Sequence, residues 1–444
     1  MSRLPVFALF AACTSSLSAQ WIPLTPANPP TTGNAAAIAA APNGQILLHG
    51  GYLAVTESAE TWRFDGSGWT QLVTQPSPSR RTLAEMAYDS ARNRYVMFGG
   101  GVQSGFFMAE LDETWEWDGS AWSLSTAAVR PPARIRHGMA FDSVRSRTVL
   151  YGGSAFFSSL GDTWEFDGAT WQQVSAASGP GPRSQVAMAF HAGIQRTVLF
   201  GGTSGFGVDD TTWLYDGTSW TAAPVTGPRP AARFGANMVY DPVRGVCLLF
   251  GGYDALVISL NDVWEFDGTA WTKLPATQLH SADSAYAFDA VRRVVVCVPG
   301  SAPFNALTYE FGARVDVRGT GCTGSLGVPT LVAADAPRLG QTWQLTLGGT
   351  PAVAPFAAFA FGLDSPVAVP LDAYGLTGCT SYIDPLVLTV LAPVAGGSAT
   401  VGLALPASVA LFGTPVTAQG LSVDIGWNPA WLVTTHALAG LAGW

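Results

Sequence analysis

The chain has 444 residues, of which 48% are hydrophobic and 12% are charged, and its formal net charge at pH 7 is −9. These values exclude an intrinsically disordered chain, which combines low hydrophobicity with high net charge. They also argue against a nucleic-acid partner, because proteins that bind nucleic acid present a basic face to the phosphates.

The N-terminal residues have the pattern of an export signal. Arg3 is followed by the apolar run Leu4–Ala12 and then by small residues up to Ala19. A short basic region, an apolar region and a small-residue cleavage site are typical of a signal peptide. We therefore interpret residues 1–19 as a signal peptide and expect a secreted or cell-surface protein, with the periplasm as an alternative location.

Two features of the sequence could indicate membrane attachment instead of simple export. The segment Phe10–Cys13 resembles a bacterial lipobox, but phenylalanine fits its first position poorly, so a lipid anchor at Cys13 is the less favoured interpretation. The long uncharged stretch of residues 385–423 is interrupted by prolines and alternates in part with period two, which indicates strands. We therefore expect no transmembrane segment.

A repeat of about fifty residues dominates the chain after the signal region. Its first landmark is a glycine pair that follows an apolar run. The pairs are Gly50–Gly51, Gly99–Gly100, Gly152–Gly153, Gly201–Gly202 and Gly251–Gly252, with Pro299–Gly300 at the sixth position.

The second landmark is a pair of tryptophans seven residues apart with Asp-Gly between them, as in Trp62, Asp65-Gly66 and Trp69. The other tryptophan pairs are Trp115 and Trp122, Trp164 and Trp171, Trp213 and Trp220, and Trp264 and Trp271. Asp-Gly between alternating aromatic runs predicts a β-hairpin, because glycine accepts positive φ without steric cost.

We therefore expect each copy to form four short strands. A single four-stranded sheet of this size cannot bury both of its faces by itself. Radial stacking lets each sheet cover its neighbour, as in a β-propeller. The paired glycines and the tryptophans also resemble those of the Kelch-repeat family. The resemblance covers six copies in residues 34–312 and implies a six-bladed Kelch-type β-propeller, which we assign to residues 20–317.

The first and sixth copies depart from the pattern. The first copy lacks the arginine and the methionine that precede the glycine pair elsewhere, and the sixth has Tyr309 for its first tryptophan and no second one. Because Trp21–Leu24 resembles Trp69–Leu72, we expect it to be the outer strand of the sixth blade. Arg314–Val317 is the alternative closing strand.

The composition changes near Arg318, where the repeat stops and charged residues become rare. Short alternating runs separated by turn residues continue to the C-terminus, so we expect a β-sandwich over residues 318–444, which makes the whole chain all-β. In an exported protein, Cys322 and Cys379 are the best disulfide candidates. Cys247 and Cys297 occupy apolar strands of the repeat and are expected to be buried thiols.

Four arginines recur five residues before a methionine in successive copies, at Arg81, Arg134, Arg183 and Arg233. They could form a ring of positive charge that faces an anionic ligand at one mouth of the propeller. Because the spacing is periodic, bridging between blades through carboxylates or carbonyls is the favoured interpretation. Acidic residues before the first tryptophan recur as well, which favours turn capping over cation binding.

The connections between each glycine pair and the next tryptophan vary most between copies, and they are rich in aromatic residues. Variable loops on a rigid scaffold are a common design for a binding face. The candidate binding residues are Phe106, Phe107, Phe156, Phe157, Phe206 and Tyr253, with the four arginines as further candidates.

These residues predict a non-catalytic binding or scaffold module for a protein or carbohydrate ligand, without a cofactor or a metal. The alternative is a carbohydrate-active enzyme such as a galactose oxidase-like copper oxidase. That site needs two histidines, two tyrosines and a cysteine near one tyrosine, and no such set stands out. Neither metal-binding spacings nor a nucleotide fingerprint was found in the sequence.

Overall fold

The computed structural model describes residues 34–300, apart from 54–55, 105–106, 175–177, 206, 243 and 278–283. It also describes residues 22–24, 26 and 28–30, and the strands from β32 onward. Every element in these parts of the chain is a β-strand, and they contain no apolar helix long enough to cross a membrane. The expected signal peptide, Cys13, Cys322 and Cys379 lie outside the described residues.

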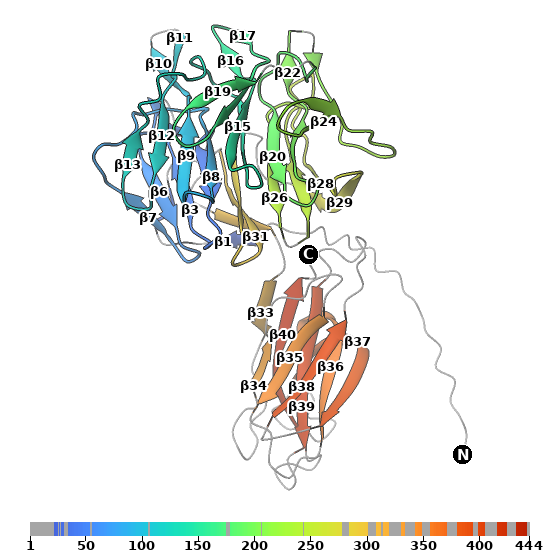
Figure 1. Cartoon of the computed structure of the whole chain (residues 1–444). Helices are drawn as coiled ribbons and strands as arrows, with labels where there is room; N and C mark the ends of the chain where they lie inside the picture. The colour runs from blue at the N-terminus through green and yellow to red at the C-terminus, as the bar shows by residue number, and fades with distance from the viewer. Residues whose placement is uncertain are drawn as a thin grey trace.

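Each repeat forms one four-stranded antiparallel sheet, as predicted (Figure 1). The first sheet contains β2 (Ala37–Ala40), β3 (Ile46–His49), β6 (Thr61–Phe64) and β7 (Trp69–Leu72). The second contains β8 (Glu85–Asp89), β9 (Arg94–Phe98), β12 (Thr114–Trp117) and β13 (Trp122–Leu124). The third contains β14 (Gly138–Asp142), β15 (Arg147–Tyr151), β18 (Thr163–Phe166) and β19 (Trp171–Val174).

The later repeats follow the same order. One sheet contains β20 (Ala187–His191), β21 (Arg196–Phe200), β24 (Thr212–Tyr215) and β25 (Trp220–Ala222). The next contains β26 (Asn237–Asp241), β27 (Val246–Phe250), β28 (Asp262–Phe266) and β29 (Trp271–Thr277). The last contains β30 (Ala285–Asp289), β31 (Val294–Val298), β32 (Thr308–Phe311) and β1 (Ile22–Leu24).

The outer strand of the last sheet thus comes from the N-terminal end of the chain. β1 runs antiparallel to β32 with Pro23 opposite Tyr309. The alternative strand β33 (Arg314–Arg318) pairs instead with β40 (Leu432–Leu441). One sheet therefore joins segments almost three hundred residues apart, and this pairing ties the start of the repeat region to its end.

The sheets are arranged as a β-propeller. Their first strands contact one another in the order β2, β8, β14, β20, β26 and β30, and β30 contacts β2. Each apolar cluster draws on two neighbouring sheets, as where Met86 of one sheet packs with Ala37 and Ala39 of the sheet before it. Both faces of a sheet are therefore covered by its neighbours, which is how a propeller buries its apolar surface.

The Asp-Gly hairpins form as the sequence predicts. In the second repeat Trp117 lies opposite Trp122, and Gly119 between them has a φ of 98°. The Asp118 carboxylate accepts hydrogen bonds from the backbone N–H groups of Ser120 and Ala121, each at 2.8 Å. Hydrogen bonds from the Ser120 hydroxyl and these backbone groups lower the pKa of Asp118 to about 2, so the turn keeps its charge over the whole neutral range.

The second tryptophan of a repeat also joins neighbouring sheets. Trp171 is fully buried, and its indole N–H donates to the Thr114 hydroxyl of the preceding sheet at 2.9 Å. The same donation links Trp122 to Thr61, Trp220 to Thr163 and Trp271 to Thr212. A buried indole needs such a partner, because an unpaired polar group in an apolar core is costly.

The glycine pairs are required by close backbone contacts inside the propeller. Gly99 and Gly100 have φ values of 66° and 91°, which favour glycine. A Cβ on Gly99 would lie 2.6 Å from the Arg134 carbonyl oxygen, and one on Gly100 would lie 2.9 Å from that of Thr82. A side chain at either position would push the neighbouring backbone away.

The C-terminal strands form two further sheets. The larger contains β33, β40, β39 (Pro415–Val423), β36 (Phe356–Pro370) and β37 (Thr380–Pro393). The smaller contains β34 (Thr330–Ala333), β35 (Thr342–Gly348) and β38 (Ser398–Ala404). This region is therefore built of β-strands like the propeller, but without its repeat.

Candidate binding face

One face of the propeller carries small two-stranded hairpins between the second and third strands of its sheets. Several of them stand together along the top edge of the propeller in Figure 1. They are β4 (Tyr52–Leu53) with β5 (Thr56–Glu57), β10 (Gly101–Ser104) with β11 (Phe107–Glu110), β16 (Ser154–Ala155) with β17 (Ser158–Ser159), and β22 (Thr203–Ser204) with β23 (Gly207–Val208). We call this the hairpin face.

A collar of backbone hydrogen bonds surrounds the axis on the same face. Its members are Ala35, Leu83, Arg136, Gln185 and Gly235, each located two residues before the first strand of its sheet and each with φ between 52° and 65°. The N–H of each member after Ala35 donates to the carbonyl of the member before it, at 2.8–3.1 Å. The collar fixes the mouth of the propeller independently of side-chain identity.

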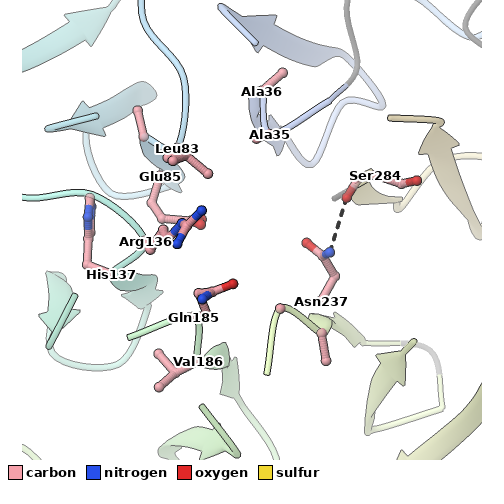
Figure 2. A pocket seen from close by; sticks show the side chains of 13 residues that line it. Ala35, Ala36, Leu83, Glu85, Arg136, His137, Gln185, Val186, Asn237 and Ser284 are labelled. Carbon is pink, nitrogen blue, oxygen red and sulfur yellow. Dashed lines mark hydrogen bonds between the residues drawn. The ribbon is translucent and has the colours of Figure 1, made fainter. Parts of the chain in front are cut away.

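The side chains of the collar and of the strands behind it enclose a cavity of about 80 Å³. Figure 2 shows Glu85, Arg136 and Gln185 on one side of the cavity and Asn237 and Ser284 on the other. The Asn237 side-chain amide donates to the Ser284 carbonyl at 3.1 Å. The remaining wall consists mostly of alanine and other small residues, so the polar groups are concentrated on part of the lining.

The electrostatics of the cavity are dominated by desolvation. Burial inside the channel raises the pKa of Glu85 from 4.5 to about 8. Burial, together with the charge of Arg134, lowers the pKa of His137 to about 3. At neutral pH the Glu85 carboxyl is therefore largely protonated, while His137 is neutral and Arg136 carries the positive charge of the mouth.

Aromatic side chains protrude from two neighbouring hairpins. Phe107, Phe156 and Phe157 are 65%, 82% and 87% exposed, and we call them the aromatic crown. Phe156 and Phe157 form the two-residue loop between Ala155 and Ser158, with φ values of 47° and 65°. Such a loop favours Asn-Gly, and a bulky residue there costs about 1–2 kcal/mol.

The crown hairpins are tied to one another and to the first sheet. The Glu110 carboxylate accepts a hydrogen bond from the Phe156 N–H at 3.1 Å, and the rings of Phe107 and Phe157 meet edge to face at 6.3 Å. On the other side, the Glu57 carboxylate accepts from the Gln103 N–H at 2.7 Å. These contacts hold the exposed phenyl rings in place.

A second apolar projection lies in the connection between β27 and β28, and the sequence analysis missed it. Leu256, Val257 and Ile258 are 78%, 66% and 56% exposed, and we call them the aliphatic tip. Tyr253, which the sequence singled out, is only partly exposed, and its ring lies 5.7 Å from that of Phe234. The other two predicted residues, Phe106 and Phe206, lie outside the described residues.

The four recurrent arginines are buried and paired inside the propeller, which is the arrangement that their periodic spacing favours. Arg81, Arg134 and Arg233 are 0% exposed and Arg183 is 8% exposed. Each donates to the carbonyl oxygen of a first glycine of its own sheet and pairs with an acidic side chain. The carboxylate partners are Glu113 at 2.6 Å, Asp162 at 2.7 Å, Asp209 at 3.3 Å and Asp262 at 2.7 Å, for Arg81, Arg134, Arg183 and Arg233 respectively.

The backbone of each arginine meanwhile binds the preceding sheet. The Arg134 carbonyl accepts from the Gly100 N–H at 3.0 Å, and its N–H donates to the Leu111 carbonyl at 3.2 Å. The Asp162 carboxylate also accepts from the Trp164 indole at 2.7 Å. The arginine and its carboxylate thus form a clamp between two sheets, which accounts for the periodic spacing of both residues.

Within the described residues, no three histidine, cysteine or acidic side chains are grouped so that they could hold a metal ion. His49, His137 and His191 are buried at three different junctions between sheets. Cys247 and Cys297 are buried free thiols, and burial raises the pKa of both.

Comparison with known proteins agrees with this architecture. Residues 113–287 match the family model of the KLHDC2/KLHL20/DRC7 Kelch-repeats domain. The matched segment begins at the acidic residue of one clamp and extends into β30. No curated protein matches the chain. The repeat and the sheets define the fold as a β-propeller, and residues 113–287 of it are similar to Kelch repeats.

Proposed function

We propose that this propeller is a non-catalytic module that binds a protein through the aromatic crown and the aliphatic tip of the hairpin face. The observation that carries the proposal is the Phe156–Phe157 loop. Two phenylalanines occupy positive-φ positions and remain more than four-fifths exposed, so they cost free energy both in backbone strain and in contact with water. Burial of the two phenyl rings against a partner would recover the free energy that their contact with water costs.

The chemistry of the projections favours a protein over a polysaccharide. Sugar rings stack on flat aromatic faces and need polar groups close to the stack, whereas the aliphatic tip offers branched apolar side chains. Exposed apolar groups held in fixed positions are typical of the centre of a protein interface. Each phenyl ring buried by a partner is worth about 1.5–3 kcal/mol.

The architecture that we propose for the whole chain follows the sequence. The sheets form a six-bladed ring that β1 completes, over residues 20–317. Residues 318–444 form a β-sandwich, for which the two C-terminal sheets provide support. The N-terminal signal supports export to the cell surface or the medium, where Cys322 and Cys379 would be joined as a disulfide.

The crown can be tested without unfolding the protein. The double substitution F156N/F157G removes both phenyl rings and places the preferred residues in the turn. Binders would be selected from a display library of folded protein domains with the full chain as bait, and immobilised glycans would be tested in parallel. We expect protein binders whose affinity falls at least about tenfold with the double variant.

The matched control removes exposed apolar side chains elsewhere. Val144 and Val291 are 55% and 62% exposed in turns between first and second strands, and V144S/V291S should leave binding unchanged. Protein binders that tolerate F156N/F157G would refute the role of the crown. Binding that is restricted to glycans and lost in the double variant would replace the protein partner by a polysaccharide.

A further inference from the structure

Three polar side chains converge on the cavity inside the collar without partners. Within the described part of the chain, the side chains of Glu85, Arg136 and Gln185 make no hydrogen bond and no ion pair, although all three line the same cavity. Arg136 is exposed, and Glu85 and Gln185 are partly exposed, so all three can reach a ligand that enters the cavity from solvent. A concave site with a few convergent polar groups is the usual form of a small-molecule site, and here these groups come from three neighbouring sheets.

The polar residues are also exceptions to the repeat. At the collar position the other sheets have Ala35, Leu83 and Gly235, and at the position of Glu85 the neighbouring sheet has Gly138. The fold therefore requires neither the Glu85 carboxyl group nor the Arg136 guanidinium, since the collar is built from backbone hydrogen bonds. This is the opposite of the clamp arginines, which recur because the fold uses them.

The size and the charges of the cavity define the class of ligand. A volume of about 80 Å³ has room for about five to eight water-sized groups, at about 10–15 Å³ each. The lining presents one guanidinium, one carboxyl group and the Gln185 carboxamide. We propose that this cavity binds a small zwitterion of amino-acid size, with its carboxylate on Arg136 and its ammonium group on Glu85.

Pairing with the ligand would satisfy both charges at once. The Arg136 guanidinium donates to the ligand carboxylate, and the ionised Glu85 carboxylate accepts from the ligand ammonium group. Gln185 can donate to or accept from either end. Because Glu85 is protonated in the empty cavity at neutral pH, binding releases one proton, and affinity should rise as the pH is raised toward about 8. The other ionisable group of the lining, His137, stays neutral in this range.

The proposal is tested by calorimetric titration of the full chain with glycine, and separately with acetate and methylammonium at equal ionic strength. We expect saturable binding of glycine and at least about tenfold weaker binding of either half-ligand. E85Q and R136Q should each weaken glycine binding by about 10- to 100-fold. R130Q is the matched control, since Arg130 pairs with Asp112 at 2.8 Å outside the cavity, and it should leave the affinity unchanged.

Three results would overturn the proposal. Acetate binding as tightly as glycine, with affinity falling as the pH rises, would make the cavity a simple anion site. Methylammonium binding as tightly would make it a cation site, and absence of saturable glycine binding by folded protein would remove the site. F156N/F157G should bind glycine normally, so failure of the crown and failure of the cavity are distinguished by the same set of variants.

Discussion

We expect the clamp formed by Arg134 and Asp162 to make a large contribution to the free energy of unfolding. Arg134 is fully buried, and its guanidinium donates to the Gly152 carbonyl at 2.8 Å and to both oxygens of Asp162 at 2.7 and 2.8 Å. R134M keeps most of the side-chain volume and removes these bonds. The Asp162 carboxylate then keeps only the Trp164 indole among its side-chain partners. Removing one member of a buried ion pair costs about 3–5 kcal/mol.

The same chain provides a matched pair on the surface. Arg130 and Asp112 are 2.8 Å apart, with side chains 49% and 41% exposed, so R130M should cost only about 0–1 kcal/mol. Urea unfolding followed by tryptophan fluorescence would measure both variants. If R134M loses no more unfolding free energy than R130M, the clamp does not hold the sheets together and the reasoning is wrong.

The pH dependence of the R134M variant gives a second measurement. Burial alone would raise the pKa of Asp162, and the bonds from Arg134 outweigh it and hold that pKa below its ordinary value. Without Arg134 the pKa of Asp162 should rise, so the carboxyl can take up a proton as the pH falls. The loss of stability in R134M should therefore be smaller at pH 4 than at pH 7, and an equal loss at both would contradict a charge-based clamp.

Three further predictions concern other buried groups. The pKa of Glu85 is raised from 4.5 to about 8, so the folded protein keeps a proton that the unfolded chain loses. Stability should thus fall as pH rises from about 4.5 to 8, by at most about 5 kcal/mol, and E85Q should abolish this slope in urea unfolding. T114V leaves the Trp171 indole unpaired and should cost about 1–3 kcal/mol in the same assay. Cys247 and Cys297 should react with a thiol reagent only after unfolding, because burial keeps both protonated.

The interpretation of the arginines shows how far periodicity can be used. Recurrence at one position in successive repeats indicates a structural role, and Arg81 and its equivalents are indeed buried against carboxylates. The sequence alone could not separate this role from a ring of charge facing a ligand, because spacing along the chain does not reveal on which side of a sheet a side chain lies. The contact between sheets decided it.

The exposed loops were predictable only in outline. The connections after the glycine pairs were recognised as variable and aromatic, and Phe107, Phe156 and Phe157 are exposed there. The aliphatic tip was missed because the candidate residues in these connections were aromatic, and Leu256–Ile258 contains no aromatic residue. The sequence did contain a signal for the cavity in the collar, because Arg136 and Gln185 stand where the other repeats have small or apolar residues.

The amino-acid sequence alone determined the repeat, its four strands and its hairpins, because these depend on local patterns such as Asp-Gly between tryptophans and glycines with positive φ. Only the tertiary structure decided which recurrent charges are buried between sheets and which apolar loops project into solvent. It also brought Glu85, Arg136 and Gln185 to one cavity. Those residues come from three different repeats, and only the packing of sheets around a common axis places them within reach of one ligand.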